Sequence, residues 1–130
     1  DISQDMLFLA RTNLYQAGIT NCTMRHGDMY QLRFGDESFD TVSLDLVLSQ
    51  AEEPDRVLRE AARILRPDGN MLLLDSVQDE FHSEKGLTPA RITEWCESVG
   101  LSCLRTQVID IDNQATVLCL AQRRSTGKKE

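Results

Sequence analysis

Apolar positions recur three or four residues apart in three segments, which is the spacing of one face of an α-helix. These segments are residues 4–17, 54–65 and 89–99. Ser3 and Thr88 stand at expected N-cap positions, and proline begins the second and third segments, where it costs no hydrogen bond. Gly18 and Gly100 follow the first and third segments as expected C′ residues. The apolar face expected for the first helix consists of Met6, Ala10, Leu14 and Ala17, with Leu7 alongside.

Alternating or continuous apolar runs predict the strands. The expected strands are residues 21–26, the start of 39–49, 70–77, 101–111 and 115–123. The run at 39–49 is apolar on both faces, which is typical of a fully buried parallel strand. Asp112 and Asn113 separate the last two strands and predict a hairpin turn.

The order of these elements, α β β α β α β β, predicts an α/β fold with a mostly parallel sheet and a closing antiparallel hairpin. A parallel sheet needs a crossover after each strand, but no strand precedes the first helix. The pattern therefore reads as one domain over residues 1–123 that lacks its first strand. Residues 124–130 read as a flexible basic tail.

Charge and composition narrow the function classes. The chain has 14 basic and 21 acidic residues, a net charge of −7, which argues against nonspecific binding to nucleic-acid phosphates. Its apolar runs are too short for a membrane span, and its first residues are too polar for a signal peptide. We therefore expect a cytoplasmic protein.

The cysteines and histidines predict no metal site. None of the four cysteines, Cys22, Cys96, Cys103 and Cys119, belongs to a CxxC pair, and His26 and His82 lie outside ligand spacing. The cysteines are therefore expected to be buried, reduced thiols.

Two acids stand where a nucleoside ligand is often held. Asp1 precedes a helix N-terminus, and an acid there can accept both hydroxyls of a ribose; the helix dipole alone also favours such an acid. Asp28 follows an expected strand and can accept a hydrogen bond from an adenine amino group. Taken alone, Asp28 is better explained as an aspartate that bonds the backbone of its own turn.

Several segments together carry a family resemblance. The longest stretch, residues 39–75, contains "FDTVSL", "LVL", "LREAARILRPDG" and "LLLD" in the order strand, turn, helix, strand. "DISQDML" and "HGDMYQLRF" precede it, and "GLTPARITEWCESVGL" follows. In this order the segments resemble class I S-adenosylmethionine-dependent methyltransferases of the small-molecule type. The resemblance implies a Rossmann-like methyltransferase sheet, S-adenosylmethionine as cofactor and a small-molecule acceptor.

The resemblance also implies roles for particular residues. Asp1, with Ile2 beside it, matches the acid that holds the cofactor ribose. Asp28 matches the acid that contacts the adenine amino group, and Met29 would pack beside the ring.

A third pair completes the implied cofactor site. Leu44 and Asp45 match the region near the methionine part of the cofactor and the transferred methyl group. Ser49 and Gln50 stand where many relatives have two histidines, so no catalytic base is assigned.

The family's glycine-rich first loop has no counterpart here. We therefore expect the chain to be the C-terminal part of a longer protein, to bind the cofactor weakly by itself and to self-associate through open strand edges. Two alternatives remain open. One is a non-catalytic methyltransferase-like regulatory domain behind a winged-helix module, and the other is a nicotinamide-dependent oxidoreductase.

Overall fold

The structure is a computed structural model that describes residues 3–23, 25, 27–77 and 87–125. The chain forms two compact units, Asp1–Arg33 and Phe34–Glu130. Asp1, Ile2, His26 and His82 lie outside the described residues. None of the described helices has the length and apolar character needed to cross a membrane.

The first unit contains helix α1, Gln4–Gln16. Its predicted caps are confirmed: the Ser3 hydroxyl accepts a hydrogen bond from the Met6 N–H at 3.2 Å, and Gly18 has a φ of 73°. Leu7 is the buried residue of the helix, whereas Met6, expected on the buried face, is 57% exposed.

The strand predicted at 21–26 is wrong for the part that is described, because residues 21–23 and 25 form no strand. Alternation alone does not make a strand when no neighbour supplies the ladder hydrogen bonds. Cys22 is exposed in this segment, which corrects the expectation of a buried thiol.

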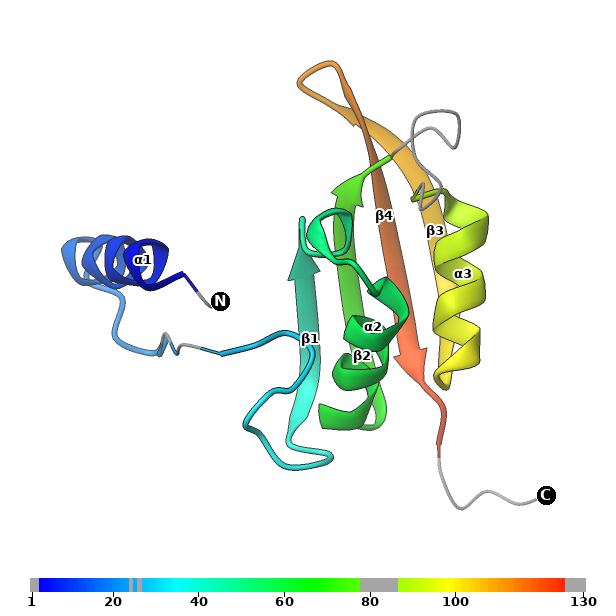
Figure 1. The fold of residues 1–130 in the computed structure, drawn as a ribbon, viewed down its shortest axis with the longest axis horizontal. Coiled ribbons are helices and arrows are strands. Elements are labelled where there is room, and N and C mark those ends of the chain that lie inside the picture. Colours follow the sequence, from blue (N-terminus) through cyan, green and yellow to red (C-terminus); the bar gives the residue numbers. More distant parts are fainter. Residues whose placement is uncertain (1–2, 24, 26, 78–86, 126–130) are drawn as a thin grey trace. The chain divides into compact units, whose positions relative to one another are not determined.

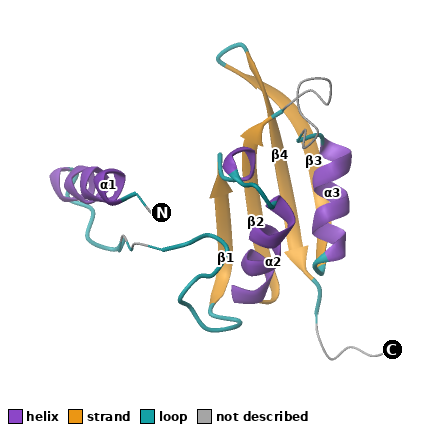
Figure 2. Cartoon of the chain, viewed as in Figure 1, coloured by secondary structure: helices purple, strands orange, loops and turns teal. Residues whose placement is uncertain are grey.

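The second unit is built on a four-stranded mixed sheet with the order β1-β2-β4-β3. Its strands are β1 (Phe39–Asp45), β2 (Leu65–Ser76), β3 (Leu101–Ile111) and β4 (Gln114–Arg123). β1 and β2 are parallel, and the β2–β4 and β4–β3 pairs are antiparallel. Helices α2 (Pro54–Ile64) and α3 (Pro89–Ser98) lie on one face of this sheet (Figures 1 and 2).

The core of this unit lies between the two helices and the sheet. The stripe predicted for the second helix is confirmed for Val57, Leu58, Ala61 and Ala62, which are buried, whereas Leu65 is buried as the first residue of β2. The sheet residues that face these helices are also 0% exposed: Met71, Leu73, Val117 and Ala121. Burial of each large apolar side chain stabilises the fold by about 1.5–3 kcal/mol.

β1 is an edge strand of the described sheet, so the prediction of a fully buried strand is wrong. Val42 and Leu44 are half-buried, whereas Ser43 and Asp45 are exposed. Side chains of a strand alternate between the two faces of a sheet, and the described helices α2 and α3 lie on one face; β2 is the one described strand that pairs with β1. The open side of β1 is the strand edge on which we expected self-association.

β2 begins at Leu65, five positions before the predicted strand, because the "RPDG" turn lies inside it. The pairing moves from Phe39–Leu65 to Thr41–Asn70 across this irregularity, and Asp68 takes a positive φ of 69°. Gly69 packs there against backbone: a Cβ would lie 2.9 Å from the Asp40 carbonyl oxygen.

The C-terminal hairpin and its preceding helix are confirmed. Asp112 and Asn113 have φ values of 53° and 63°, which are the left-handed conformations of a type I′ turn. The Thr88 hydroxyl caps α3 by accepting from the Arg91 N–H at 3.2 Å. Of the tail expected at 124–130, residues 126–130 lie outside the described residues, and the hydroxyl of Ser125 donates to an Asp68 carboxylate oxygen at 2.7 Å.

Candidate functional site

The carboxyl ends of β1 and β2 meet at one edge of the sheet. The parallel register places Asp45 opposite Leu74, and the N–H of Leu46 donates to the Leu74 carbonyl at 2.8 Å. Ligands of open α/β sheets bind at this kind of edge. It is therefore the part of the second unit best suited to hold a ligand.

The chain turns sharply immediately after β1. Leu46 has a φ of 56°, an uncommon left-handed conformation for a residue with a branched side chain. A short 3₁₀ helix, Leu48–Gln50, follows and is anchored by Leu48, which is 1% exposed. Strained backbone of this kind occurs most often at ligand and active sites.

Asp75, near the end of β2, fixes this turn. Its carboxylate accepts hydrogen bonds from the Ser49 N–H at 3.1 Å and from the Ser76 N–H at 2.8 Å. The side chain is 0% exposed. Asp75 thereby ties the 3₁₀ helix that follows β1 to the end of β2.

Leu44 and Asp45 are the last two residues of β1 and lie at this edge. Leu44 is half-buried and Asp45 is exposed. Because consecutive strand residues point to opposite faces of a sheet, β1 presents the apolar Leu44 side chain on one face and the accessible Asp45 carboxylate on the other.

Asp28 and Met29 form a tight turn in the first unit. One Asp28 carboxylate oxygen accepts from the Tyr30 N–H at 2.9 Å, and its carbonyl accepts from the Gln31 N–H at 3.0 Å. This is the self-bonded turn that the sequence left open as an explanation. The Asp28 side chain is nevertheless exposed, so its carboxylate is accessible to an amino donor. Met29 is half-buried.

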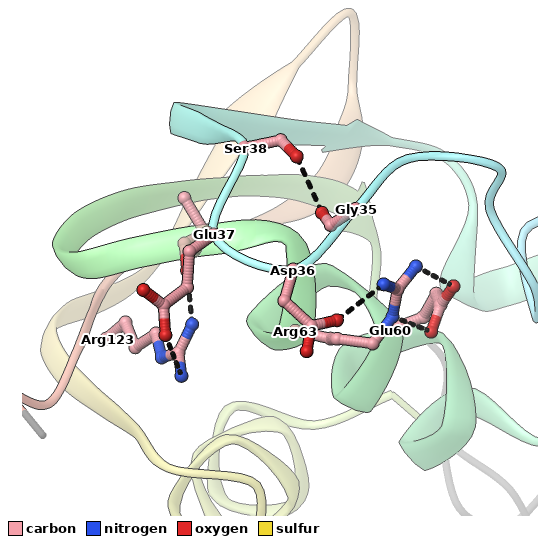
Figure 3. A network of polar contacts seen from close by, with 8 residues as sticks. Gly35, Asp36, Glu37, Ser38, Glu60, Arg63 and Arg123 are labelled. Atoms are coloured by element: carbon pink, nitrogen blue, oxygen red, sulfur yellow. Dashed lines mark hydrogen bonds and ion pairs between the residues drawn. The ribbon is translucent and has the colours of Figure 1, made fainter.

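A second polar cluster lies at the amino end of β1 and has a structural role (Figure 3). The Arg63 guanidinium bonds Glu60 at 2.7 Å and Asp36 at 2.8 Å. Hydrogen bonds from Glu60 and then Asp36 raise the pKa of Arg63 above its already high value. Glu37 pairs with Arg123 at 3.7 Å. These contacts hold the loop before β1 against α2 and β4, opposite to the edge at Asp45.

Sequence reasoning missed a cluster of three cysteines. The sulfurs of Cys96, Cys103 and Cys119 all lie within 4.8 Å of one another. The hydrogen bond with Cys96, then those with Thr106 and Cys103, lower the pKa of Cys119 to about 6, although burial acts in the opposite direction. The hydrogen bond with Cys119 and burial raise the pKa of Cys96. No CxxC spacing could reveal this cluster, because its members come from three elements.

Comparison with known proteins shows which family this chain belongs to. A family model described as a methyltransferase domain matches residues 1–129. The chain belongs to this family. Demethylmenaquinone methyltransferase of Listeria welshimeri is 35% identical over 78 residues, which cover 60% of this chain and 33% of that protein. The chain thus spans about a third of the length of the curated relatives it matches.

Solved structures agree on the fold. The cyclase SpnF superposes with a TM-score of 0.83 at 15% identity, over 95% of this chain and 64% of that one. A SAM-dependent methyltransferase of Methanosarcina mazei gives 0.81 at 17% identity, over 96% and 80% of the two chains. These likenesses confirm a Rossmann-like methyltransferase fold. Because one neighbour is a cyclase, the fold alone does not prove methyl transfer. The family match is what identifies S-adenosylmethionine as the cofactor.

Proposed function

We propose that this chain forms part of an enzyme that transfers a methyl group from S-adenosylmethionine to a small-molecule acceptor. The observation that carries the proposal is the edge where the carboxyl ends of β1 and β2 meet, in a chain that the methyltransferase family model matches over residues 1–129. That match also favours methyl transfer over hydride transfer with a nicotinamide cofactor.

The proposal keeps the six cofactor residues named from sequence. Asp1 and Ile2 would hold the ribose, and Asp28 and Met29 would hold the adenine. The accessible carboxylate of Asp28 and the half-buried side chain of Met29 support the second pair.

Leu44 and Asp45 would line the methionine end of the cofactor. The rigid turn after them supports this role, because methyl transfer depends on alignment of the reacting atoms. The cofactor supplies an electrophilic methyl group on a sulfonium. The protein's part is to position the two reactants and exclude water, which needs no dedicated base when the acceptor is already a nucleophile.

A demethylated quinol is the first acceptor to assay, because the relatives that match this chain include demethylmenaquinone methyltransferases. We further propose a cytoplasmic protein with no nucleic-acid contact through this chain. The net charge of −7 supports the latter.

Calorimetric titration of S-adenosylhomocysteine tests the cofactor site. The titration uses the complete gene product and its variants Asp28→Ala and Asp45→Ala. Each variant is expected to weaken binding by about tenfold or more, which is roughly 1.4 kcal/mol. Glu94→Ala is the matched control, since Glu94 is an exposed acid on α3.

Each outcome has a distinct meaning. Equal binding by all variants would show that the assigned residues are wrong while the family stands. An absence of both heat and thermal shift in the complete gene product would overturn the enzymatic proposal. The regulatory alternative would then take its place.

A further inference from the structure

Three of the four cysteines converge beneath helix α3. Cys96 comes from α3, Cys103 from β3 and Cys119 from β4, and their sulfurs lie within 4.8 Å of one another. The sulfurs of Cys103 and Cys119 are 3.6 Å apart. Cys96 and Cys119 are 0% exposed, whereas Cys103 is half-buried. The cluster is therefore enclosed but has one partly accessible member.

A β-bulge brings Cys103 into the cluster. Arg105 pairs with Leu120, but Cys103 pairs with Ala121, so the register shifts by one residue between them. Directly opposed residues share a face, so Cys103 lies on the same buried face as Ala121 and Cys119. In an unbroken ladder, Leu104 would take that position. Instead, Leu104 is 56% exposed. Bulges commonly re-aim a side chain at a functional site.

The spacing of the sulfurs fits coordination of one central atom. Sulfurs bound at roughly 2.3 Å to one atom lie about 3.3–4.0 Å from each other. The Cys103–Cys119 distance already falls in this range, and Cys96 lies close enough to join through a small movement. The hydroxyl of Thr106, which donates to the Cys119 sulfur at 3.7 Å, helps to orient that sulfur.

Charge decides which ion the enclosed cluster suits. Among the described residues the group has three sulfur ligands and no carboxylate or imidazole. Three thiolates around Zn²⁺ would leave one negative charge and require a fourth ligand, and around a monovalent ion they would leave two. An uncompensated buried charge is strongly unfavourable. A trivalent ion with three thiolates is neutral and needs no further ligand.

We propose that Cys96, Cys103 and Cys119 form a binding site for a trivalent thiophilic metalloid, of the arsenic(III) or antimony(III) type. With arsenous acid the step is As(OH)₃ + 3 RSH → As(SR)₃ + 3 H₂O. Three arsenic–oxygen bonds break, three arsenic–sulfur bonds form, and each thiol proton leaves in a water molecule. No oxidant or reductant is needed. Cys103, the partly accessible thiol, is the point of entry.

The bound ion would join α3 to the β3–β4 hairpin. An unfolded chain does not hold the three thiols within coordinating distance of one another, so the folded state binds the ion more tightly. Binding therefore stabilises the fold by an amount that grows with the logarithm of the ligand concentration. We therefore expect the melting temperature to rise by several degrees when arsenite is in excess.

Titration of arsenite into the whole chain, with a phosphine as the non-thiol reductant, tests the site. We expect one equivalent to bind, with sulfur-to-arsenic charge-transfer absorption and three sulfur neighbours by X-ray absorption. Fewer than three sulfurs would overturn the proposal without any variant. So would tighter binding of Zn²⁺ or Cu⁺ than of arsenite, since it would refute the charge argument.

Variants then assign the sulfurs. Cys103→Ser is the mildest change, because Cys103 is half-buried, and it should weaken arsenite binding at least about tenfold. Cys22→Ser is the matched control, because Cys22 is exposed and outside the cluster. Unchanged affinity in Cys103→Ser, or a loss of affinity in Cys22→Ser, would contradict the assignment.

Discussion

Replacement of Asp75 should loosen the turn after β1. In Asp75→Ala the N–H groups of Ser49 and Ser76 lose their acceptor in an environment where the side chain was 0% exposed. Hydrogen bonds to a charged group contribute about 1.5–3 kcal/mol each, and water can partly replace the bond at Ser49, which is half-buried. We therefore expect a loss of about 2–4 kcal/mol in the free energy of unfolding.

Urea denaturation measures this loss directly, and the melting temperature should fall by on the order of 10 °C. Asp75→Asn keeps one acceptor oxygen but turns an NH₂ group toward the other N–H. Its free energy of unfolding should therefore lie between those of wild type and Asp75→Ala. Glu94→Ala is the control and should stay within about 0.5 kcal/mol of wild type.

Hydrogen exchange separates the local effect from the global one. The Ser49 amide should exchange at least about tenfold faster in Asp75→Ala, under conditions where the core of β4 stays protected. A free energy of unfolding within about 0.5 kcal/mol of wild type, with unchanged exchange at Ser49, would refute the reasoning. It would mean that the buried carboxylate does not hold the turn.

Two further changes test the backbone. Gly69→Ala should lower the free energy of unfolding, measured in urea, by about 1–3 kcal/mol, because its Cβ would meet the Arg66 carbonyl oxygen at 2.8 Å. Gly35→Ala is the control and should be nearly neutral, because its nearest contact is a side-chain oxygen at 3.6 Å. Equal effects of the two variants would contradict the packing argument. Asn113→Gly should raise the melting temperature slightly, because glycine adopts the φ of 63° without strain, and a lower melting temperature would contradict the assigned turn.

Local signals made the helices and the hairpin predictable from sequence. The caps at Ser3 and Thr88 act on residues three positions away, so the pattern contains the whole interaction. The turn at Asp112–Asn113 is equally local, because both residue types tolerate a positive φ. The second helix was predictable because its apolar stripe is long and faces the core.

The errors fell where structure depends on distant partners. The segment at 21–26 alternates like a strand, but whether alternation becomes a strand depends on a neighbour that the pattern does not contain. β1 has an apolar composition, yet its burial depends on its edge position in the sheet. Cys103 joins the cysteine cluster through a bulge that no local spacing reveals.

The cofactor residues divide in the same way. The turn at Asp28 and the strand end at Leu44 and Asp45 are local features, and the structure contains both. Whether they act on one ligand remains part of the proposal, because they belong to different units. The family match supports them as a set and not individually.

Asp75 shows how a strand's final acid can serve its neighbour. A buried carboxylate is unfavourable unless hydrogen bonds compensate for its lost water, and here one of the two bonds comes from Ser49, 26 residues earlier in the chain. The same five-residue segment, 46–50, also contains the left-handed Leu46, whose strain of about 1–3 kcal/mol must be opposed elsewhere. The Leu46–Leu74 backbone bond, the Asp75–Ser49 bond and the buried Leu48 all oppose it. The acid after "LLL" therefore has a role that requires no contact with a ligand: it holds the neighbouring turn in a conformation that the turn's own sequence disfavours.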